Sequence, residues 1–480
     1  MPSSTVLIIG AGPAGLTAAY EIAKQTSLTP LVVEASSQIG GLSRTEERDG
    51  NRLDIGGHRF HSNSAWVRNW WQQFIPIHAA ATDQPLDHML VQQRKSRILY
   101  AGRLFDYPLS PTPATLSQLG WTRAVGFLFS YLHACCRPRL PERHLEDFFI
   151  NRFGERLYRT FFADYTEKVW GVPCSQIAAD WGAERVKGIS ISRALLDSII
   201  PRSDEPSLTR EFWYPPRGPG QLWSRVADAI TDSGGQIRLN HRLARLTLRG
   251  QRIVAAEMET PRGRQSLTCT AVFSSMPISH LVGALEAHPP ESIRQQAKAL
   301  PYRDFITIGL LLDKKLLDAN CLVATAEDHW IYIQEPGLRL GRVQLFHNWS
   351  PHLVADADRH LWLGFEYFCA QGDDLWEQSD AELRRLAIRE AEQINLFNGS
   401  ALAASYPIRV PKAYPAYTGN YRHTQGLFDY LTGIENLSLI GRNGRHKYDN
   451  QDVAMLSARD EVARLVQHCR PASGKGSTQL

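Results

Sequence analysis

The sequence lacks a long apolar run, because no stretch of about 18 or more consecutive apolar residues occurs in the chain. A helix that spans a bilayer needs about 20 such residues, so none is predicted. The first apolar run already begins at Thr5, which leaves no room for the basic and apolar regions of a secretory signal peptide. We therefore expect a cytoplasmic protein.

Cysteine and excess charge are also scarce. The 7 cysteines are odd in number and include no CxxC pair, which argues against a disulfide framework and a cysteine-bound zinc ion. The net charge of +4 is too small for this length to indicate nucleic-acid binding. A hydrophobic content of 43% with 21% charged residues is typical of a globular protein, and 480 residues predict about two or three domains.

The N-terminal stretch from Thr5 to Gly15 reads TVLIIGAGPAG. A short apolar strand ends there at glycines in GxGxxG spacing, which is typical of a strand that turns into a helix facing a diphosphate. Gly10 would form the turn, and Gly12 would admit the pyrophosphate. The motif alone also occurs in turns without a ligand, so the surrounding sequence decides whether a dinucleotide is predicted to bind. The other residues expected at the cofactor are Pro13, Ala14 and Gly15, the last of which packs helix on strand.

A second strand, Leu31 to Val33, supplies that context. It ends at Glu34, about 20 residues beyond the last glycine, where a carboxylate accepts hydrogen bonds from a ribose diol. The same charge disfavours NADP as the bound ligand, because a 2′-phosphate would be repelled. A second glycine turn and a cation follow, and the further residues expected at the cofactor are Ala35, Gly41, Leu42 and Arg44.

With these motifs, the N-terminus resembles the FAD-binding family that includes amine oxidases, phytoene desaturases, protoporphyrinogen oxidases and UDP-galactopyranose mutases. The resemblance implies non-covalently bound FAD. It also implies an α/β fold, in which a Rossmann-type FAD-binding domain of the glutathione reductase-like, amine oxidase type carries an inserted mixed α+β cap domain that binds the substrate.

The pattern of strands and helices predicts how the chain is divided. We assign the FAD-binding domain to residues 1–75, 218–300 and 426–470, the cap to residues 76–217 and 301–425, and a disordered tail to residues 471–480. The clearest predicted elements are a tryptophan-rich helix after His61, an antiparallel meander over residues 243–269, a strand from Ala271 to Met276 that stops at Pro277 and turns towards the flavin, strands Phe305 to Leu312 and Leu361 to Tyr367, and helix Asp380 to Gln393.

Residues 120–136, GWTRAVGFLFSYLHACC, are apolar enough for a surface helix that dips into a bilayer, and Arg137, Arg139 and Arg143 follow. A buried helix with a basic capping turn explains the same residues. Because Arg123 and His133 interrupt the apolar run, we favour the buried helix and expect no membrane contact.

A glycine loop, GGHRFHS, follows the second glycine turn. His58 and His61 are spaced as a metal pair, but a metal site needs further clustered ligands, so no metal is predicted. We expect instead a loop packed beneath the flavin, with His58 also among the catalytic residues. The loop residues assigned to the cofactor are Gly56, Gly57, His58 and Arg59.

The predicted cap contains motifs that resemble those of UDP-galactopyranose mutases. DYTEKVWG, Asp164 to Gly171, resembles a signature whose tyrosine and tryptophan contact the nucleotide of a nucleotide sugar, which implies this role for Tyr165 and Trp170. Arg185 falls close to the position of one phosphate-binding arginine. Residues 330–349 resemble the strand pair that brings a second arginine to the diphosphate, and their assigned residues are Tyr332, Arg342 and Trp349.

The C-terminal GRNGRHKYDNQD resembles the flavin motif of the same mutases. The resemblance implies that Tyr448 reaches a substrate phosphate. In PKAYPAYTGNY, which resembles amine oxidases as much as mutases, Tyr417 is the residue expected to face the ligand. The cofactor set is completed by Leu243, Gly441, Arg442, Asn450, Gln451 and Val453.

Three functions stay open at this point, and all of them use FAD. In the favoured one, N5 of the reduced flavin attacks the anomeric carbon of a UDP- or dTDP-sugar. Two guanidinium groups and a phenol, from Arg185, Arg342 and Tyr448, would then hold the diphosphate. The alternatives are an oxidoreductase of the amine oxidase or desaturase type that removes a hydride from a small molecule, and a binding protein with structural FAD. NAD(P)H is a candidate external reductant.

Overall fold

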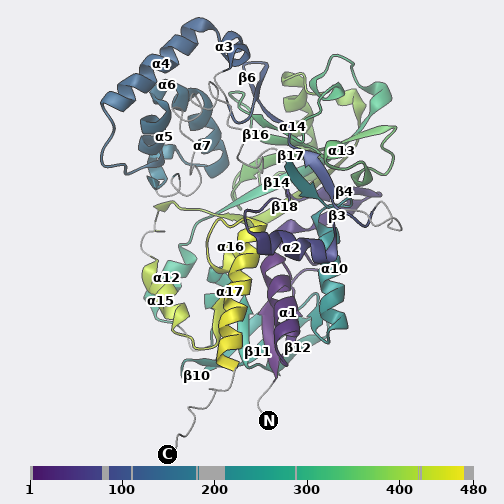
Figure 1. Cartoon of the computed structure of the whole chain (residues 1–480), viewed down its shortest axis with the longest axis vertical. Coiled ribbons are helices and arrows are strands. Elements are labelled where there is room, and N and C mark those ends of the chain that lie inside the picture. The colour runs from purple at the N-terminus through teal and green to yellow at the C-terminus, as the bar shows by residue number, and fades with distance from the viewer. Residues whose placement is uncertain are drawn as a thin grey trace, which may run out of the picture.

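A parallel sheet of five strands forms one half of the molecule (Figure 1). The computed structural model describes residues 4–77, 86–109, 112–179, 182, 211–286, 289–419, 421 and 424–469. Strands from distant parts of the chain lie side by side in the sheet, in the order β19 (Leu437–Leu439), β13 (Ala271–Ser274), β1 (Thr5–Ile9), β2 (Thr29–Val33) and β9 (Gln236–Arg238). Neighbouring strands are all parallel, so their carboxyl ends meet at one edge.

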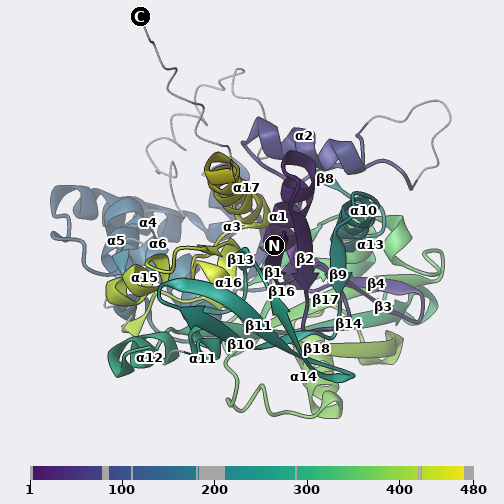
Figure 2. The ribbon, with the colours of Figure 1, turned by 90° about the horizontal axis from the view of Figure 1, so that it is seen from below.

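Different elements cover the two faces of this sheet (Figure 2). One face packs against helices, namely α1 (Pro13–Gln25), α2 (Ala65–Phe74), α10 (Pro219–Asp232) and α17 (Gln451–Cys469). The other face packs against the antiparallel meander and three short helices, namely β10 (Arg242–Arg249), β11 (Arg252–Thr260), β12 (Gly263–Thr268), α11 (Ile278–Ala284), α12 (Glu291–Lys298) and α15 (Gln425–Thr432). Because both faces are covered, the central strands are almost wholly apolar.

A mixed sheet of seven strands forms the other half. Its order is β18 (Leu402–Pro415), β14 (Tyr302–Asp313), β17 (His360–Cys369), β16 (Leu340–Leu345), β15 (Trp330–Ile333), β6 (Ser96–Tyr100) and β7 (Arg103–Asp106). Helix α14 (Asp380–Gln393) packs on one face. Two short antiparallel pairs are also present: the hairpin of β3 (Thr45–Arg48) with β4 (Asn51–Asp54), and the pair of β5 (Leu90–Gln93) with the distant β8 (Glu211–Tyr214).

A helical lobe extends beside the mixed sheet, at the upper left of Figure 1. It contains α3 (Pro113–Leu119), α4 (Trp121–Cys136), α5 (Leu145–Phe153), α6 (Glu155–Tyr158) and α7 (Asp164–Trp170). Its core is aromatic, and Phe148, Phe149 and Phe153 of α5 supply most of it.

The structure confirms the α/β class and the predicted elements named above, and α14 begins and ends at the predicted residues. In each of the two large sheets, strands from distant parts of the chain pair with one another. The domain boundaries themselves stay a prediction.

The prediction that residues 120–136 form a buried helix is wrong. Helix α4 forms there, but only Gly126 and Ala134 are buried, while Trp121, Leu128 and Phe129 are exposed. The reason is that α5 already fills the interior of the lobe with phenylalanines, so α4 contributes small residues to the contact. Among the described residues, no helix combines the length and apolar character needed to cross a bilayer.

A buried carboxyl group joins distant segments near the junction of the two sheets. Asp54, at the end of β4, is inaccessible to solvent. It accepts hydrogen bonds from the hydroxyl groups of Tyr214 on β8 and Thr45 on β3, the latter at 2.8 Å. Burial raises the pKa of Asp54 from 3.8 to about 7, although both hydrogen bonds act in the opposite direction.

The raised pKa predicts a specific pH dependence of stability. Between the ordinary and the raised pKa the folded protein keeps a proton that the unfolded chain has lost, so stability falls as pH rises through this range, by up to about 1.4 kcal/mol per pH unit. Asp54→Asn should remove this part of the slope. The measurement is urea unfolding at several pH values, with the exposed Asp358→Asn as the matched control. An unchanged slope in Asp54→Asn would contradict this account.

Candidate functional site

The first glycine turn brings backbone close to backbone. Gly10 has a φ of +102° between β1 and α1, and its N–H donates to the carbonyl oxygen of Val33 at 2.8 Å. A Cβ on Gly15 would overlap the carbonyl oxygen of Gly10, and a Cβ on Gly41 would lie 2.9 Å from Cα of Gly12. The glycine turns therefore pack so closely that a side chain at Gly15 or Gly41 would meet backbone.

Glu34 is fixed at the end of β2 by three hydrogen bonds. Its Oε2 accepts the backbone N–H of Ala11 at 2.9 Å, while its Oε1 accepts the N–H and the hydroxyl of Ser36 at 2.9 and 2.8 Å. The carboxylate thus ties the first glycine turn to the second strand. Its position on the wall of a pocket is the one in which an acid can meet a ribose.

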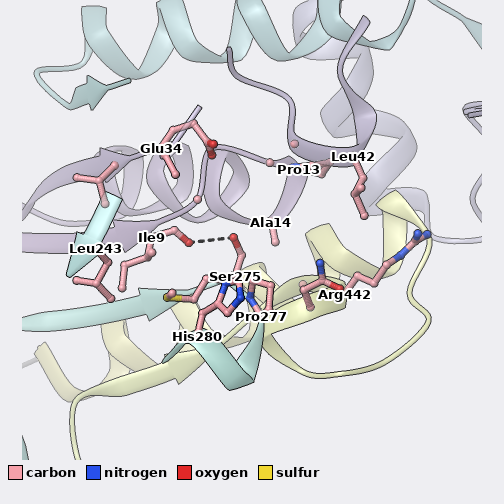
Figure 3. Close-up of a pocket in the computed structure, with 18 of the residues that line it drawn as sticks. Ile9, Pro13, Ala14, Glu34, Leu42, Leu243, Ser275, Pro277, His280 and Arg442 are labelled. Atoms are coloured by element: carbon pink, nitrogen blue, oxygen red, sulfur yellow. Dashed lines mark hydrogen bonds between the residues drawn. The ribbon is translucent and has the colours of Figure 1, made fainter. Parts of the chain in front are cut away.

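The pocket, of about 610 Å³, opens along the carboxyl edge of the parallel sheet. Figure 3 shows that it is elongated, with Glu34 and Leu243 towards one end and Leu42 and Arg442 towards the other. Between them, Ser275 donates its hydroxyl to the carbonyl oxygen of Ile9 at 2.9 Å. A long, glycine-walled pocket with an acid near one end and a cation near the other fits the shape and charge of a dinucleotide.

Many of the residues predicted to contact the cofactor line this pocket. They are Gly10, Gly12, Pro13, Ala14, Glu34, Ala35, Gly41, Leu42, His58, Leu243, Gly441, Arg442 and Gln451. They come from the glycine turns, the end of β2, the start of β10, and the segment that runs from α16 (Gly441–Gly444) to the start of α17. Segments far apart in sequence thus line one pocket.

Other predicted cofactor residues do not line the pocket. Gly15 packs α1 on β1, and Arg44 supports the second glycine turn by donating to Glu46 at 2.7 Å and to the carbonyl oxygen of Gly41 at 3.2 Å. The side chain of Val453 is exposed on α17, whereas its neighbour Ala454 lines the pocket. The other predicted cofactor residues that do not line the pocket are Gly56, Gly57, Arg59 and Asn450.

The pocket is also lined by residues that the sequence analysis missed. They come from the end of β13 and the start of α11, of which only Pro277 was singled out, and from the start of β10. The signal was present, because β13 lies beside β1 in a parallel sheet and ligands bind at the carboxyl ends of such strands. The missed lining residues include Ser275, Met276, Ser279, His280, His241 and Arg242.

His58 lies where this pocket meets the mixed-sheet half. Burial, followed by the charges of Arg442 and Arg342, lowers the pKa of His58 to about 3, so its imidazole is neutral at physiological pH. Its Nδ1 has no hydrogen-bond partner among the described residues. Such a nitrogen is available to a ligand that enters the pocket.

Arg342, on β16, is held by a buried carboxylate. Its Nε donates to Oε2 of Glu366 at 2.7 Å and its Nη2 donates to the same oxygen, while Nε2 of Gln344 donates to Oε1 at 2.8 Å. Burial opposes the charge of Arg342, but Glu366 outweighs it and raises the pKa of Arg342 well above its ordinary value. No described residue accepts a hydrogen bond from Nη1, and the side chain stays 19% exposed.

A cluster of cations and tyrosines surrounds this arginine. The rings of Tyr165 and Tyr107 both pack against Tyr332, with centroids 5.7 and 4.8 Å away. The charges of Arg59, Arg94 and Arg342 all act on the hydroxyl of Tyr107. Arg94 and Tyr107 were missed by the sequence analysis, because no motif marks them. We call Arg59, Arg94, Arg342, Tyr107, Tyr165 and Tyr332 the arginine–tyrosine cluster.

The motif around Tyr165 is positioned by its lysine. Nζ of Lys168 donates to the carbonyl oxygens of Ile333 and Leu340, both at 3.0 Å, and so fixes α7 against β15 and β16. Trp170, predicted to bind substrate, is almost fully buried, and its ring packs 5.9 Å from that of Tyr448. It contributes mainly to the core of the lobe.

Tyr448 lies at the other side of the site. Its ring stacks on Tyr414 with centroids 5.1 Å apart, and the guanidinium of Arg442 lies 4.9 Å above it. The hydroxyl of Tyr417, predicted to face the ligand, accepts the backbone N–H of Tyr448 at 2.7 Å. Tyr417 therefore positions the loop of Tyr448.

Trp349 and Arg185 were also predicted to contact the substrate. Trp349 is only 1% exposed, and its Nε1 donates to the carbonyl oxygen of His329 at 2.8 Å, so its ring belongs to the core and its role towards a substrate stays a prediction. Arg185 lies outside the described residues.

Comparison with known proteins now identifies the family. The family model for flavin containing amine oxidoreductases matches residues 13–410. The chain belongs to this family. It is therefore an FAD-dependent enzyme with a Rossmann-type cofactor domain and an inserted cap, as the pocket and the two sheets indicate.

Three solved structures show the same fold. A reduced UDP-galactopyranose mutase matches with a TM-score of 0.80 and 20% identity, over 98% of this chain and 94% of the other. A protein from Exiguobacterium sp. 255-15, named as a candidate protoporphyrinogen oxidase, gives 0.72 and 18% over 98% and 100% of the chains. An engineered putrescine oxidase gives 0.63 and 16% over 97% and 99%. At these identities the likeness is one of fold.

The glycine turns predict how single methyl groups affect FAD binding. A Cβ on Gly12 would lie 3.6 Å from the nearest atom, so Gly12→Ala fits the protein itself. It should nevertheless weaken FAD binding by at least about tenfold, or about 1.4 kcal/mol, because the methyl group faces the pyrophosphate. FAD content and affinity after gel filtration would measure this effect.

Gly15→Ala provides the contrast. Its Cβ overlaps protein backbone, so this substitution should lower the melting temperature of the FAD-free protein, whereas Gly12→Ala should leave it unchanged. Equal FAD affinity in Gly12→Ala and the unsubstituted protein would contradict the proposed position of the pyrophosphate.

Proposed function

We propose that this enzyme acts on a nucleotide sugar, UDP- or dTDP-linked, and rearranges it at the anomeric carbon without net oxidation. The observation that supports this function best is the arginine–tyrosine cluster beside the cofactor pocket. Three cations near aromatic rings suit a ligand that combines a diphosphate with planar and sugar groups.

Arg342 is suited to bind one phosphate. Glu366 accepts from Nε and Nη2, which fixes the plane of the guanidinium and leaves Nη1 for a ligand. Arg94 donates from Nη2 to the carbonyl oxygen of Tyr107 at 3.2 Å, while its buried Nε has no partner among the described residues. Because an unsatisfied buried donor costs free energy, a phosphate oxygen at these atoms would stabilise the bound state.

The buried ion pair of Arg342 and Glu366 is poorly explained by a purely structural role, because such pairs add little net stability to a fold. Taking both charges out of water opposes folding, and a pair of well-packed apolar residues is often as stable. The presence of this pair is better explained if it presents a fixed cation to a ligand. Tyr165 and Tyr332, held by α7 and β15, would form the adjoining wall for the base or the sugar.

The chain's own residues would also position the cofactor. The glycine turns and Glu34 would hold its diphosphate and ribose, and Leu42, His58 and Arg442 would surround the end nearest the cap. FAD, when bound, supplies a flavin whose N5 can act as a nucleophile or exchange a hydride. A neutral His58 would orient groups there without adding a charge.

The second candidate is an oxidoreductase that removes a hydride from a small molecule. The family description and the similarity to putrescine oxidase support it. The two candidate functions differ in how the substrate affects the oxidised flavin. A redox substrate should bleach the oxidised flavin anaerobically with no other reductant, whereas a nucleotide sugar should not, and dithionite or NAD(P)H would be needed to form the active reduced enzyme.

Replacing Arg342 tests the proposal directly. Calorimetry with UDP and dTDP should show binding to the holoenzyme, and Arg342→Lys should weaken it by at least about tenfold, because charged hydrogen bonds of the guanidinium are worth about 1.5–3 kcal/mol. Arg97→Lys is the matched control, since Arg97 pairs with the buried Asp328 in the same sheet but outside the cluster.

Three results would contradict the proposal. One is the absence of binding by either nucleotide or its sugars to the unsubstituted holoenzyme. Another is an equal loss of affinity in Arg342→Lys and Arg97→Lys, which would point to a general effect on the sheet. The third is bleaching of the flavin by a small-molecule substrate under anaerobic conditions.

A further inference from the structure

Helix α4 presents one continuous apolar face to solvent. Its large apolar side chains recur at intervals of three and four residues, which places them on one side of the helix. Their exposed fractions run from 48% at Val125 to 67% at Phe129. We call this face the α4 stripe; it consists of Trp121, Val125, Leu128, Phe129 and Leu132, and the exposed Cys135 and Cys136 continue it.

The stripe is not needed to hold α4 in place. The opposite side of the helix makes the contacts with the lobe, where Gly126 lies against the guanidinium of Arg156 and Phe127 packs 6.5 Å from Phe161. The hydroxyl of Ser130 accepts the backbone N–H of Arg156 at 3.0 Å. Since these contacts anchor the helix, its apolar face is free to bind something else.

The segment that carries the stripe is basic. Glu155 of α6, which lines the hollow beside Val125 and Phe129, is paired with Arg159. Between Gly120 and His144 the sequence has four arginines, one glutamate and no other charged residue besides histidine. Arg123 and Arg137, at the two ends of α4, are exposed and form no ion pair within the described part of the chain. Leu140, in the turn that follows, is also exposed.

We propose that the α4 stripe binds the surface of an anionic phospholipid bilayer, with α4 lying in the plane of the interface. Trp121, Phe129 and the aliphatic residues would enter the acyl boundary, while the arginines at the helix ends would contact lipid phosphates. The helix lies on the outer edge of the lobe, where a flat surface can reach it (Figure 1). This proposal is independent of the substrate.

The dimensions of the stripe favour a bilayer over a protein partner. The 16 residues of α4 give a strip about 24 Å long and one helix wide. A stable interface between proteins buries about 800 Å² on each side, which is more than such a strip offers. A bilayer needs no matching shape, and the basic helix ends complement its charge.

Vesicle sedimentation with the holoenzyme tests the proposal. The protein should bind vesicles of phosphatidylcholine mixed with phosphatidylglycerol more tightly than vesicles of phosphatidylcholine alone. Binding should weaken with salt, because the Debye length falls from about 10 Å at 0.1 M to about 3 Å at 1 M. The double variant Leu128→Ser/Phe129→Ser should reduce the partition coefficient at least about tenfold, because it removes two large apolar side chains that would be buried in the bilayer.

Leu316→Ser is the matched control, since Leu316 is also exposed but lies outside the lobe. FAD content and melting temperature should be unchanged in both variants, which separates loss of binding from loss of fold. No binding to anionic vesicles at low salt, or equal binding by the double variant, would overturn the proposal. A dimer in light scattering that the double variant abolishes would also overturn it, because the stripe would then be covered by a second copy.

Discussion

Contact between backbones without room for side chains is the constraint on which the cofactor site depends. Strand β1, helix α1 and the second glycine turn approach so closely that a Cβ at Gly15 or Gly41 would meet another part of the main chain. The approach sets the direction of α1 and brings its N-terminus to the edge of the parallel sheet. Glu34 and the end of β13 reach the same edge because their strands are the neighbours of β1.

Features that depend on local chemistry were predictable from the sequence. A glycine with positive φ at the end of an apolar strand, an acid at the end of the next strand and a capped helix such as α14 are each determined within a few residues. For that reason the cofactor class, the main strands and many of the residues that line the pocket followed from motifs. The roles given to Tyr165 and Arg342 rested on resemblance, and the structure brings both residues into one cluster.

Features that depend on which surfaces meet were not predictable. Neither the motif that contains Trp349 nor the apolar run of α4 shows which side chains are buried, yet Trp349 is enclosed by the mixed sheet while α4 is left outside a lobe that α5 already fills. No sequence motif marks Arg94 and Tyr107. They lie near Arg342 because the pairing of β6 with β15 brings their segment there. Burial and proximity of this kind are properties of the assembled sheets.

Substrate recognition is proposed to depend on the arginine–tyrosine cluster, which would bind the diphosphate of a nucleotide sugar next to the flavin. The most direct measurement is a crystal structure of the holoenzyme soaked with UDP. We predict that its phosphates lie within hydrogen-bond distance of Nη1 of Arg342 and Nε of Arg94, with its base beside Tyr165 or Tyr332. A nucleotide that occupies only the site of the FAD adenosine, or that leaves the cluster empty, would contradict the claim.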